Sequence, residues 1–156
     1  MAIPPNHLFA TLKDHIGHDF GESNPTRLDQ PRIDRFAECT GDDQWIHVDV
    51  ERARTQTSIG DTIVHGLLLL SLIPAAQYEL GVYPPDASNV LNYGFDKVRF
   101  MAQVTAGTSI VLRVELADVA AKGPGRALVR CRNTAYALDA PERPVMVAES
   151  LGMVLA

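Results

Sequence analysis

Apolar and polar positions follow different periods in the two halves of the chain. Residues 7–16 carry apolar side chains at helical spacing, with Asn6 as a candidate N-cap. Residues 49–57 could form a short helix that Asp49 caps. From Val90 onward, apolar and polar residues alternate with the period of two that is typical of strands. The first half is therefore predicted to be helical with loops, and the second half to form strands.

A further helix has boundary residues at both ends. Asp29 is a candidate N-cap, and Pro31 stands in the first turn, where its missing N–H costs nothing. Gly41 suits the position just past the helix end. The buried face is expected to carry Ile33, Phe36, Ala37 and Thr40. Asp42 would then lie on a turn immediately after the helix.

The most hydrophobic stretch, residues 66–76, is apolar all round and predicts a helix buried on most sides. Gly81 would end it, while Pro74 inside it predicts a kink or a lost hydrogen bond. The strands that follow include 110–116 and 127–133, with Gly-Pro-Gly at 123–125 as their hairpin turn. A last strand is expected over about 145–155. A long buried helix followed by an antiparallel meander predicts an α+β fold, with the sheet wrapped around that helix.

Composition narrows the class of protein. At 156 residues, with 46% hydrophobic and 21% charged residues, the chain has the size and balance of a single soluble domain. The longest apolar stretch is too short to span a bilayer, and the N-terminus lacks the features of a signal peptide, so a cytoplasmic protein with no membrane partner is expected. The net charge of −5 argues against nucleic acid as a partner.

Neither cysteine nor the N-terminal histidines predict a metal site. Cys39 and Cys131 form no C-x-x-C pair, and Cys39 is expected on a buried helix face. His15 and His18 are three residues apart, but Gly17 between them disfavours the helix that would bring them together. No metal and no bound cofactor are therefore expected.

Asp42 and His47 are the first candidates for chemistry. A carboxylate and an imidazole on one tight loop can converge on a single water, and the ordinary pKa of histidine, about 6.5, makes both protonation states accessible. A second pair of candidates for chemistry, His65 and Gly66, stands at the start of the apolar helix. The Gly66 N–H lacks an intrahelical partner and could stabilise an oxyanion, although a glycine chosen for close packing and a histidine bound to the backbone are alternatives.

The residues around Asp42 resemble the signature of the MaoC-like dehydratases, the (R)-specific enoyl-CoA hydratase family. The motif runs from Phe36 to His47, with Thr-Gly-Asp at 40–42 and a small residue, Ala53, six positions beyond His47. Residues 62–66, 92–100 and 147–150 also resemble the family, in its nodulation protein N-like branch. The resemblance covers about residues 20–156 and places the chain as one MaoC-like domain over 1–156.

The resemblance implies a hotdog fold, a long central helix wrapped by an antiparallel sheet, and a homodimer or larger homo-oligomer. It implies that Asp42 and His47 activate a water that adds to a trans-2-enoyl thioester of coenzyme A or of acyl-carrier protein. It also implies that the Gly66 N–H binds the thioester oxygen and that His65 belongs to the substrate site. Which of Asp42 and His47 carries each proton is left open.

This sequence also departs from the family pattern. Gln44-Trp45 replaces the usual Asn-Pro, so bulky Trp45 is expected to contact substrate and alter acyl-chain scope. A helix serine that assists some hydratases falls near Pro74, with Ser71 one turn earlier. Lys97 and Arg99 are candidates for the coenzyme phosphates, or else solvated strand charges. A hotdog thioesterase and a non-catalytic acyl-thioester-binding protein are the alternative functions.

Overall fold

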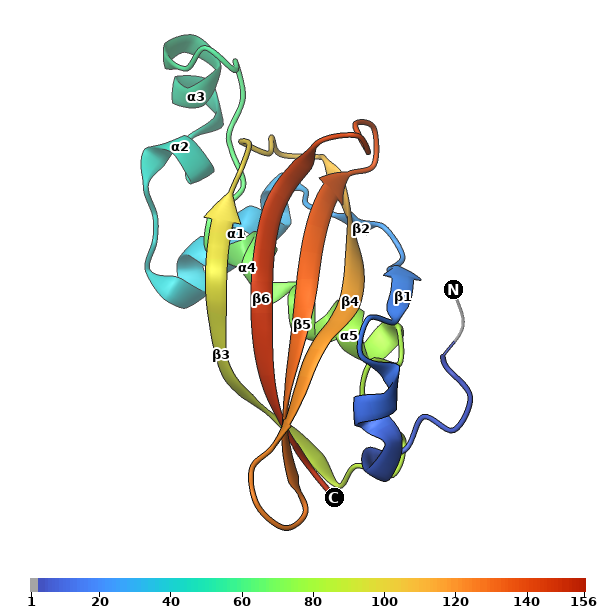
Figure 1. Cartoon of the computed structure of the whole chain (residues 1–156). Coiled ribbons are helices and arrows are strands. Elements are labelled where there is room, and N and C mark those ends of the chain that lie inside the picture. The colour runs from blue at the N-terminus through green and yellow to red at the C-terminus, as the bar shows by residue number, and fades with distance from the viewer. Residues whose placement is uncertain (1–2) are drawn as a thin grey trace.

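A computed structural model describes residues 3–156 and shows an antiparallel sheet curved around a central helical segment (Figure 1). Within this range the sheet has six strands, of which five follow the order β1-β4-β5-β6-β3, and β2 also pairs with β4. The strands are β1 (Asp19–Glu22), β2 (Thr26–Arg27), β3 (Asn89–Phe100), β4 (Ser109–Ala121), β5 (Arg126–Ala137) and β6 (Pro144–Leu155). β3 therefore lies at one edge of the sheet. The α+β class and the hotdog arrangement are confirmed.

Two helices of the first half are capped by the residues that the sequence predicts. In α1 (Gln30–Thr40) the Asp29 side chain accepts a hydrogen bond from the Arg32 N–H, and Gly41 adopts the left-handed conformation at φ 78°. In α3 (Val50–Gln56) Asp49 caps the Arg52 N–H in the same way. Between them lies the single turn α2 (Trp45–Val48). The two caps fix the ends of the segment that carries Asp42 and His47.

The central helix is not continuous, which corrects the expectation of one long helix. α4 (Gly66–Ser71) ends at Leu72, and α5 (Ile73–Glu79) begins there with Pro74 in its first turn. Proline cannot donate the hydrogen bond that a helix interior requires, but it is tolerated where a new helix starts. Leu68 and Leu69 are buried as predicted, whereas Leu67 is 61% exposed, so one side of α4 remains uncovered.

The apolar face of β4 and β5 packs in two clusters, one with α4 and α5 and one with the N-terminal residues Leu12 and Phe20. β4 and β5 are antiparallel and are joined at residues 122–125, which confirms the hairpin. The buried face of β5 alternates as its sequence predicts, with Val129, Cys131 and Ala135 inward. In β4 a register shift between Leu116 and Asp118 moves the inward phase by one residue. One part of the core thus fills the space between the sheet and α4 and α5, and the other, which includes Val129 and Cys131, packs on Leu12 and Phe20.

Three local predictions were wrong. The N-terminal segment forms a 3-10 helix, η1 (Phe9–His15), and Asn6 does not cap it because Leu8 occupies that position. Cys39 is exposed, as is Thr40, since α1 buries only the narrow stripe that contains Ile33 and Ala37. A helix that contacts its neighbours along one line leaves adjacent positions in solvent.

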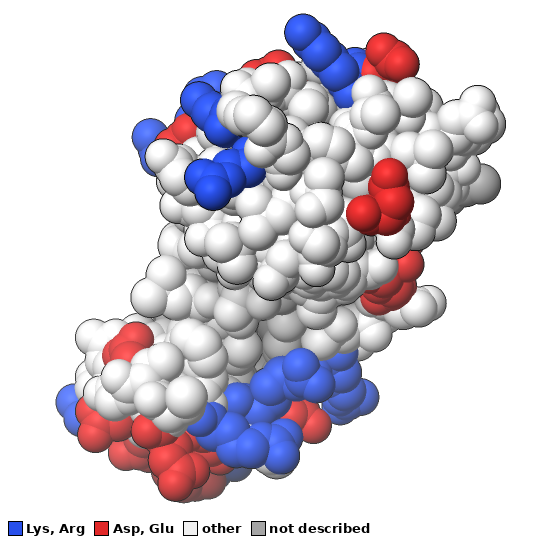
Figure 2. All heavy atoms as spheres, turned by 90° about the horizontal axis from the view of Figure 1, so that it is seen from below, with Lys and Arg blue, Asp and Glu red and all other residues white. Residues whose placement is uncertain are grey.

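The surface carries both signs of charge. In the view of Figure 2, lysine and arginine side chains lie beside aspartate and glutamate in most clusters, and a broad band between the clusters is uncharged. On this face, neither sign of charge predominates. Among residues 3–156, no helix is long and apolar enough to cross a membrane.

Candidate active site

Asp42 and His47 lie on consecutive turns beside the N-terminus of α4. Asp42 is exposed on the loop that follows α1, and its N–H donates to the Thr40 hydroxyl at 3.3 Å. His47, in α2, is only 7% exposed. The left-handed Gly41 turns the chain sharply enough to bring Asp42 back over α2. Helix boundaries predicted from the sequence therefore place both residues at one end of the central helix.

Backbone contacts fix the orientation of His47. Its Nδ1 lies 2.6 Å from the Ile63 carbonyl oxygen, and because a carbonyl can only accept, Nδ1 carries the proton. In the neutral ring, Nε2 is then the nitrogen that is free to accept a proton. The Gln30 amide donates to the His47 carbonyl at 2.8 Å, and the Thr62 hydroxyl donates to Gln30 in turn. These bonds tie α2 to α1 and to the segment that leads into α4.

His65 lies between Asp42 and His47. Its Nε2 is 2.9 Å from the Asp42 backbone carbonyl, and its ring stacks on His47 with the centroids 3.8 Å apart at an interplanar angle of 25°. It also contacts Phe36, at a centroid distance of 5.0 Å. His65 is 2% exposed, so little of its surface is open to a substrate.

The side chains of Asp42, His47 and His65 form one polar cluster. Each offers a carboxylate oxygen or a ring nitrogen, and these atoms lie within 4.8 Å of one another. Two imidazoles and a carboxylate are ligands that zinc accepts. His47 offers Nε2, because its Nδ1 donates to Ile63, and the neutral His65 ring offers Nδ1, because its Nε2 donates to Asp42. The same three groups could hold a water between the Asp42 carboxylate and His47.

The pKa of His47 favours the neutral imidazole. Burial lowers the pKa below the ordinary value of 6.5, and the neighbouring His65 lowers it further. The hydrogen bond to the Ile63 carbonyl and the Asp42 carboxylate act in the opposite direction. Because the net shift is downward, the ring is neutral at pH 7 and can accept a proton.

Gly66 borders an apolar cavity that also contains His47. The cavity has a volume of about 180 Å³ and is lined by His47, Ile63, Val64, Gly66, Leu69, Phe100, Ala102, Gln103 and Val104. The Phe100 ring lies so close to Gly66 that a Cβ at this position would be 2.9 Å from the ring. The first N–H groups of a helix have no partner inside it, so Gly66 can present its N–H to a ligand in this cavity.

Trp45 lies in a neighbouring cavity. That cavity, of about 280 Å³, is lined by Trp45, Ile46, Thr57, Ser58, Ile59, Asp61, Ile63 and Gln103. Ile63 and Gln103 border both cavities, so the two adjoin. The Arg52 guanidinium stacks over the Trp45 ring, 4.1 Å from its centroid. A substrate that extends from His47 past Ile63 would meet Trp45.

Lys97 and Arg99 lie on β3, away from the cavity that contains His47. The Lys97 ammonium pairs with Glu149 at 2.8 Å, and Arg130 pairs with the same carboxylate at 2.8 Å. Lys97 has a φ of 51° within the irregularity between Asp96 and Arg99. The Arg99 guanidinium donates to the Val98 carbonyl and is exposed. A role for either residue in phosphate binding stays a prediction.

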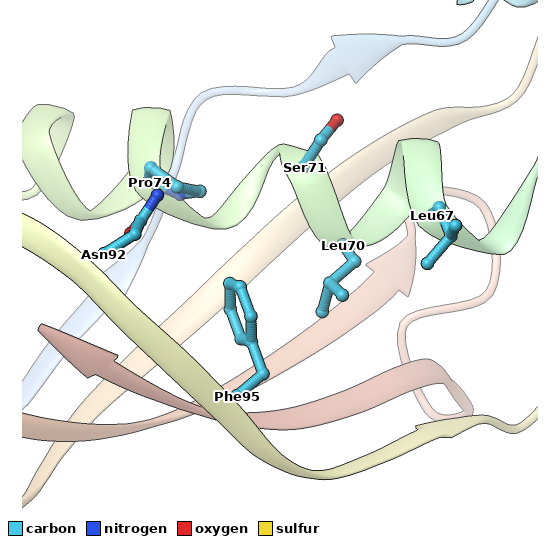
Figure 3. A pocket seen from close by; sticks show the side chains of 6 residues that line it. All are labelled: Leu67, Leu70, Ser71, Pro74, Asn92 and Phe95. Atoms are coloured by element: carbon cyan, nitrogen blue, oxygen red, sulfur yellow. The ribbon is translucent and has the colours of Figure 1, made fainter. Parts of the chain in front are cut away.

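Ser71 borders a third cavity, between the central helices and β3 (Figure 3). This cavity, of about 280 Å³, is lined by Leu67, Leu70, Ser71, Pro74, Asn92 and Phe95. The Ser71 hydroxyl donates to the Leu68 carbonyl at 2.7 Å and is turned away from Phe95 in Figure 3. Its hydrogen-bond donor is therefore already engaged within α4.

Comparison with known proteins identifies the family. The MaoC-like domain matches residues 11–136. The chain belongs to the MaoC-like domain family. It is 34% identical over 145 residues to nodulation protein N of Rhizobium leguminosarum bv. viciae, covering 93% of this chain and 89% of that protein. It is also 34% identical over 142 residues to 3-hydroxyacyl-thioester dehydratase Z of Mycobacterium tuberculosis, covering 91% and 92%.

A solved structure shares the MaoC-like fold. The R-hydratase PhaJ1 from Pseudomonas aeruginosa, in its unliganded form, superposes with a TM-score of 0.73 at 24% identity. The match covers 90% of this chain and 81% of that chain. At this identity the similarity shows that the two proteins share the arrangement of the sheet and helices.

Three residues of the site were missed in the sequence. Gln30 holds α2 through the His47 carbonyl, while Phe100 and Gln103 line the cavity beside Gly66. Gln30 could have been noticed as a polar residue in the first turn of α1, but its partner is seventeen residues away. Phe100 is the last residue of β3 and Gln103 lies three positions further on, and no local pattern connects them to Gly66.

Proposed function

We propose that this MaoC-like protein is an (R)-specific enoyl-thioester hydratase, which also catalyses the reverse dehydration of 3-hydroxyacyl thioesters. The observation that carries the proposal is the placement of a carboxylate and a neutral imidazole beside an apolar cavity that Gly66 also borders. The similarity to a 3-hydroxyacyl-thioester dehydratase over 91% of the chain supports the same reaction.

In the proposed reaction, Asp42 and His47 hold one water between them. One water proton passes to this pair as the water oxygen bonds to the β-carbon of a trans-2-enoyl thioester. The double-bond electrons move toward the thioester oxygen, where the Gly66 N–H stabilises the enolate. A proton then goes to the α-carbon, so that the net change is the addition of one water. Removing and supplying these protons is general acid–base catalysis.

The remaining side chains of the site would contact the substrate. The Gly66 cavity would hold the reacting end of the acyl group, and Trp45 would limit the part that extends past Ile63. Lys97 and Arg99 would contact the phosphates of coenzyme A. Lys97 would first have to leave its ion pair with Glu149. The coenzyme A or acyl-carrier protein enters as part of the substrate, and the reaction itself requires neither metal nor a further cofactor.

We further propose that the protein acts as a homodimer in the cytoplasm, through contacts at β3. This edge strand is twelve residues long and exposes Leu91, Tyr93 and Phe100, which are 51%, 65% and 46% accessible. A long edge strand with exposed apolar side chains is a common template for association. A second copy of the chain would cover these side chains symmetrically.

Hydration of crotonyl-CoA tests the proposed function. Purified protein should consume the enoyl absorbance and produce the (R)-3-hydroxyacyl ester, and Asp42→Asn should abolish this. Short, medium and long enoyl chains should be tried before activity is judged absent. Release of free thiol without hydration would identify a thioesterase instead, and binding of the ester without either change would identify a non-catalytic binding protein.

A further inference from the structure

His65 is connected to both residues of the proposed acid–base pair. Its Nε2 hydrogen bonds to the backbone carbonyl of Asp42, and its ring stacks on that of His47. The two contacts come from different parts of the chain, because Asp42 lies on the loop after α1 and His47 lies in α2. A single ring at the start of α4 therefore contacts both members of the pair.

The hydrogen bond determines the tautomer of His65. The Asp42 carbonyl can only accept, so Nε2 donates and Nδ1 is unprotonated in the neutral ring. Nδ1 is buried and has no hydrogen-bond partner among residues 3–156. Phe36 of α1 also contacts the ring, in addition to His47. The ring is thus held by two aromatic neighbours and one hydrogen bond, and it has little surface for substrate.

We propose that His65 is a positioning residue that sets the distance between Asp42 and His47. The inference rests on the proposed function, since it assigns His65 to the acid–base pair rather than to the substrate site. The hydrogen bond holds the Asp42 loop, and the stacked ring holds the plane of the His47 imidazole. Catalytic groups must be held to within a fraction of an ångström, and a displacement of about 1 Å can lower a rate about a hundredfold.

Two substitutions separate the two contacts. His65→Phe keeps an aromatic ring against His47 but cannot donate to Asp42, and it should lower kcat for crotonyl-CoA about a hundredfold. His65→Gln retains an amide donor near the position of Nε2, and its kcat should stay within about tenfold of the native value. KM should change little in both variants, because His65 does not contact the ester. A rise in KM with an unchanged kcat would contradict the proposal.

His7 offers a matched control. It is 5% exposed, its Nε2 lies 3.0 Å from the Val82 carbonyl, and its Nδ1 is also buried without a partner among residues 3–156. It contacts η1 and β1 rather than Asp42 or His47. His7→Phe should therefore reduce stability much as His65→Phe does while leaving kcat of the folded enzyme unchanged. Equal losses of stability with native kcat in both variants would overturn the proposal.

Titration of the His47 ring by NMR gives a readout that does not need turnover. The groups that face His47 are His65 from the start of α4, Asp42 from the loop after α1, and the Ile63 carbonyl. Since His65 lowers the pKa of His47, His65→Gln should raise it. Native protein that hydrates no enoyl thioester would refute the proposed function alone. In His65→Phe, which cannot donate to the Asp42 carbonyl, unchanged amide signals around Asp42 together with an unchanged His47 titration would refute the role of His65.

Discussion

The Nδ1 atom of His47 lies 2.6 Å from the carbonyl oxygen of Ile63. This contact decides the chemistry of the ring, because it leaves Nε2 as the nitrogen that can take a proton from water. Ile63 immediately precedes the segment that leads into α4, so the same stretch of backbone that orients His47 also positions His65 and Gly66. The acid–base pair and the candidate oxyanion donor therefore share one structural support.

Removing either member of the pair should reduce activity far more than stability. Asp42→Asn and His47→Ala should each lower kcat for crotonyl-CoA at least about a hundredfold, as expected for acid–base residues. Asp43→Asn is the control, because Asp43 is an exposed carboxylate one position further along the loop. Steady-state rates measured with folded protein check this prediction. Equal rates for the Asp42 and Asp43 variants would contradict it.

Adding a methyl group at position 66 should displace either Phe100 or the start of α4. The new Cβ would lie 2.9 Å from the Phe100 ring, which is closer than carbon atoms pack. Gly66→Ala should lower kcat up to about a hundredfold through this displacement. Gly94→Ala is the control, since its Cβ would meet only Leu151 at 4.0 Å. Recovery of activity in Gly66→Ala combined with Phe100→Ala would identify the clash as the cause.

Stability should fall on mild acidification because of two buried histidines. Burial lowers the pKa of His7 and of His47 in the folded protein, so below about pH 6.5 the unfolded chain binds protons first. The free energy of unfolding should therefore decrease as the pH falls from about 6.5 toward the lowered folded values. The carboxyls of Asp19 and Glu149 also have lowered pKa values, but they affect stability only below about pH 4.5.

Urea unfolding between pH 7 and pH 5 measures this effect. His7→Phe should flatten the pH dependence, because one of the two groups that charge on unfolding is removed. What is compared is the slope of the free energy of unfolding against pH. A loss of stability that is the same at every pH therefore does not affect the comparison. Parallel curves for native and variant protein would show that His7 does not contribute.

Association at β3 should depend on its exposed apolar side chains. Tyr93→Glu should shift the protein from dimer to monomer in sedimentation equilibrium, because a charge at a 65% exposed edge position would be buried in the interface. Tyr78→Glu is the matched control, since Tyr78 is a 59% exposed tyrosine on α5. A dimer that survives the Tyr93 substitution would place the interface elsewhere.

The local sequence determined the elements that carry the acid–base pair. Asp29, Gly41 and Asp49 mark helix ends through their own hydrogen-bonding and backbone preferences, so the positions of Asp42 and His47 on adjacent turns could be predicted. The alternation of β5 and the turn at residues 122–125 could also be predicted, because each depends on neighbouring residues alone. The prediction of one long helix failed because proline permits both a kink and a new helix start, and only the packing of α4 and α5 decides between them.

The contacts across the site were decided by the tertiary structure alone. His65 meets the Asp42 carbonyl across 23 positions of the chain, and Phe100 closes against Gly66 from the end of an edge strand. Such contacts depend on how the sheet curves around α4, which no periodicity in the sequence encodes. The sequence thus supplied the proposed acid–base residues and the turns that carry them. The fold supplied their distances, the tautomer of His47 and the role inferred for His65, because these depend on segments that meet only when the chain is folded.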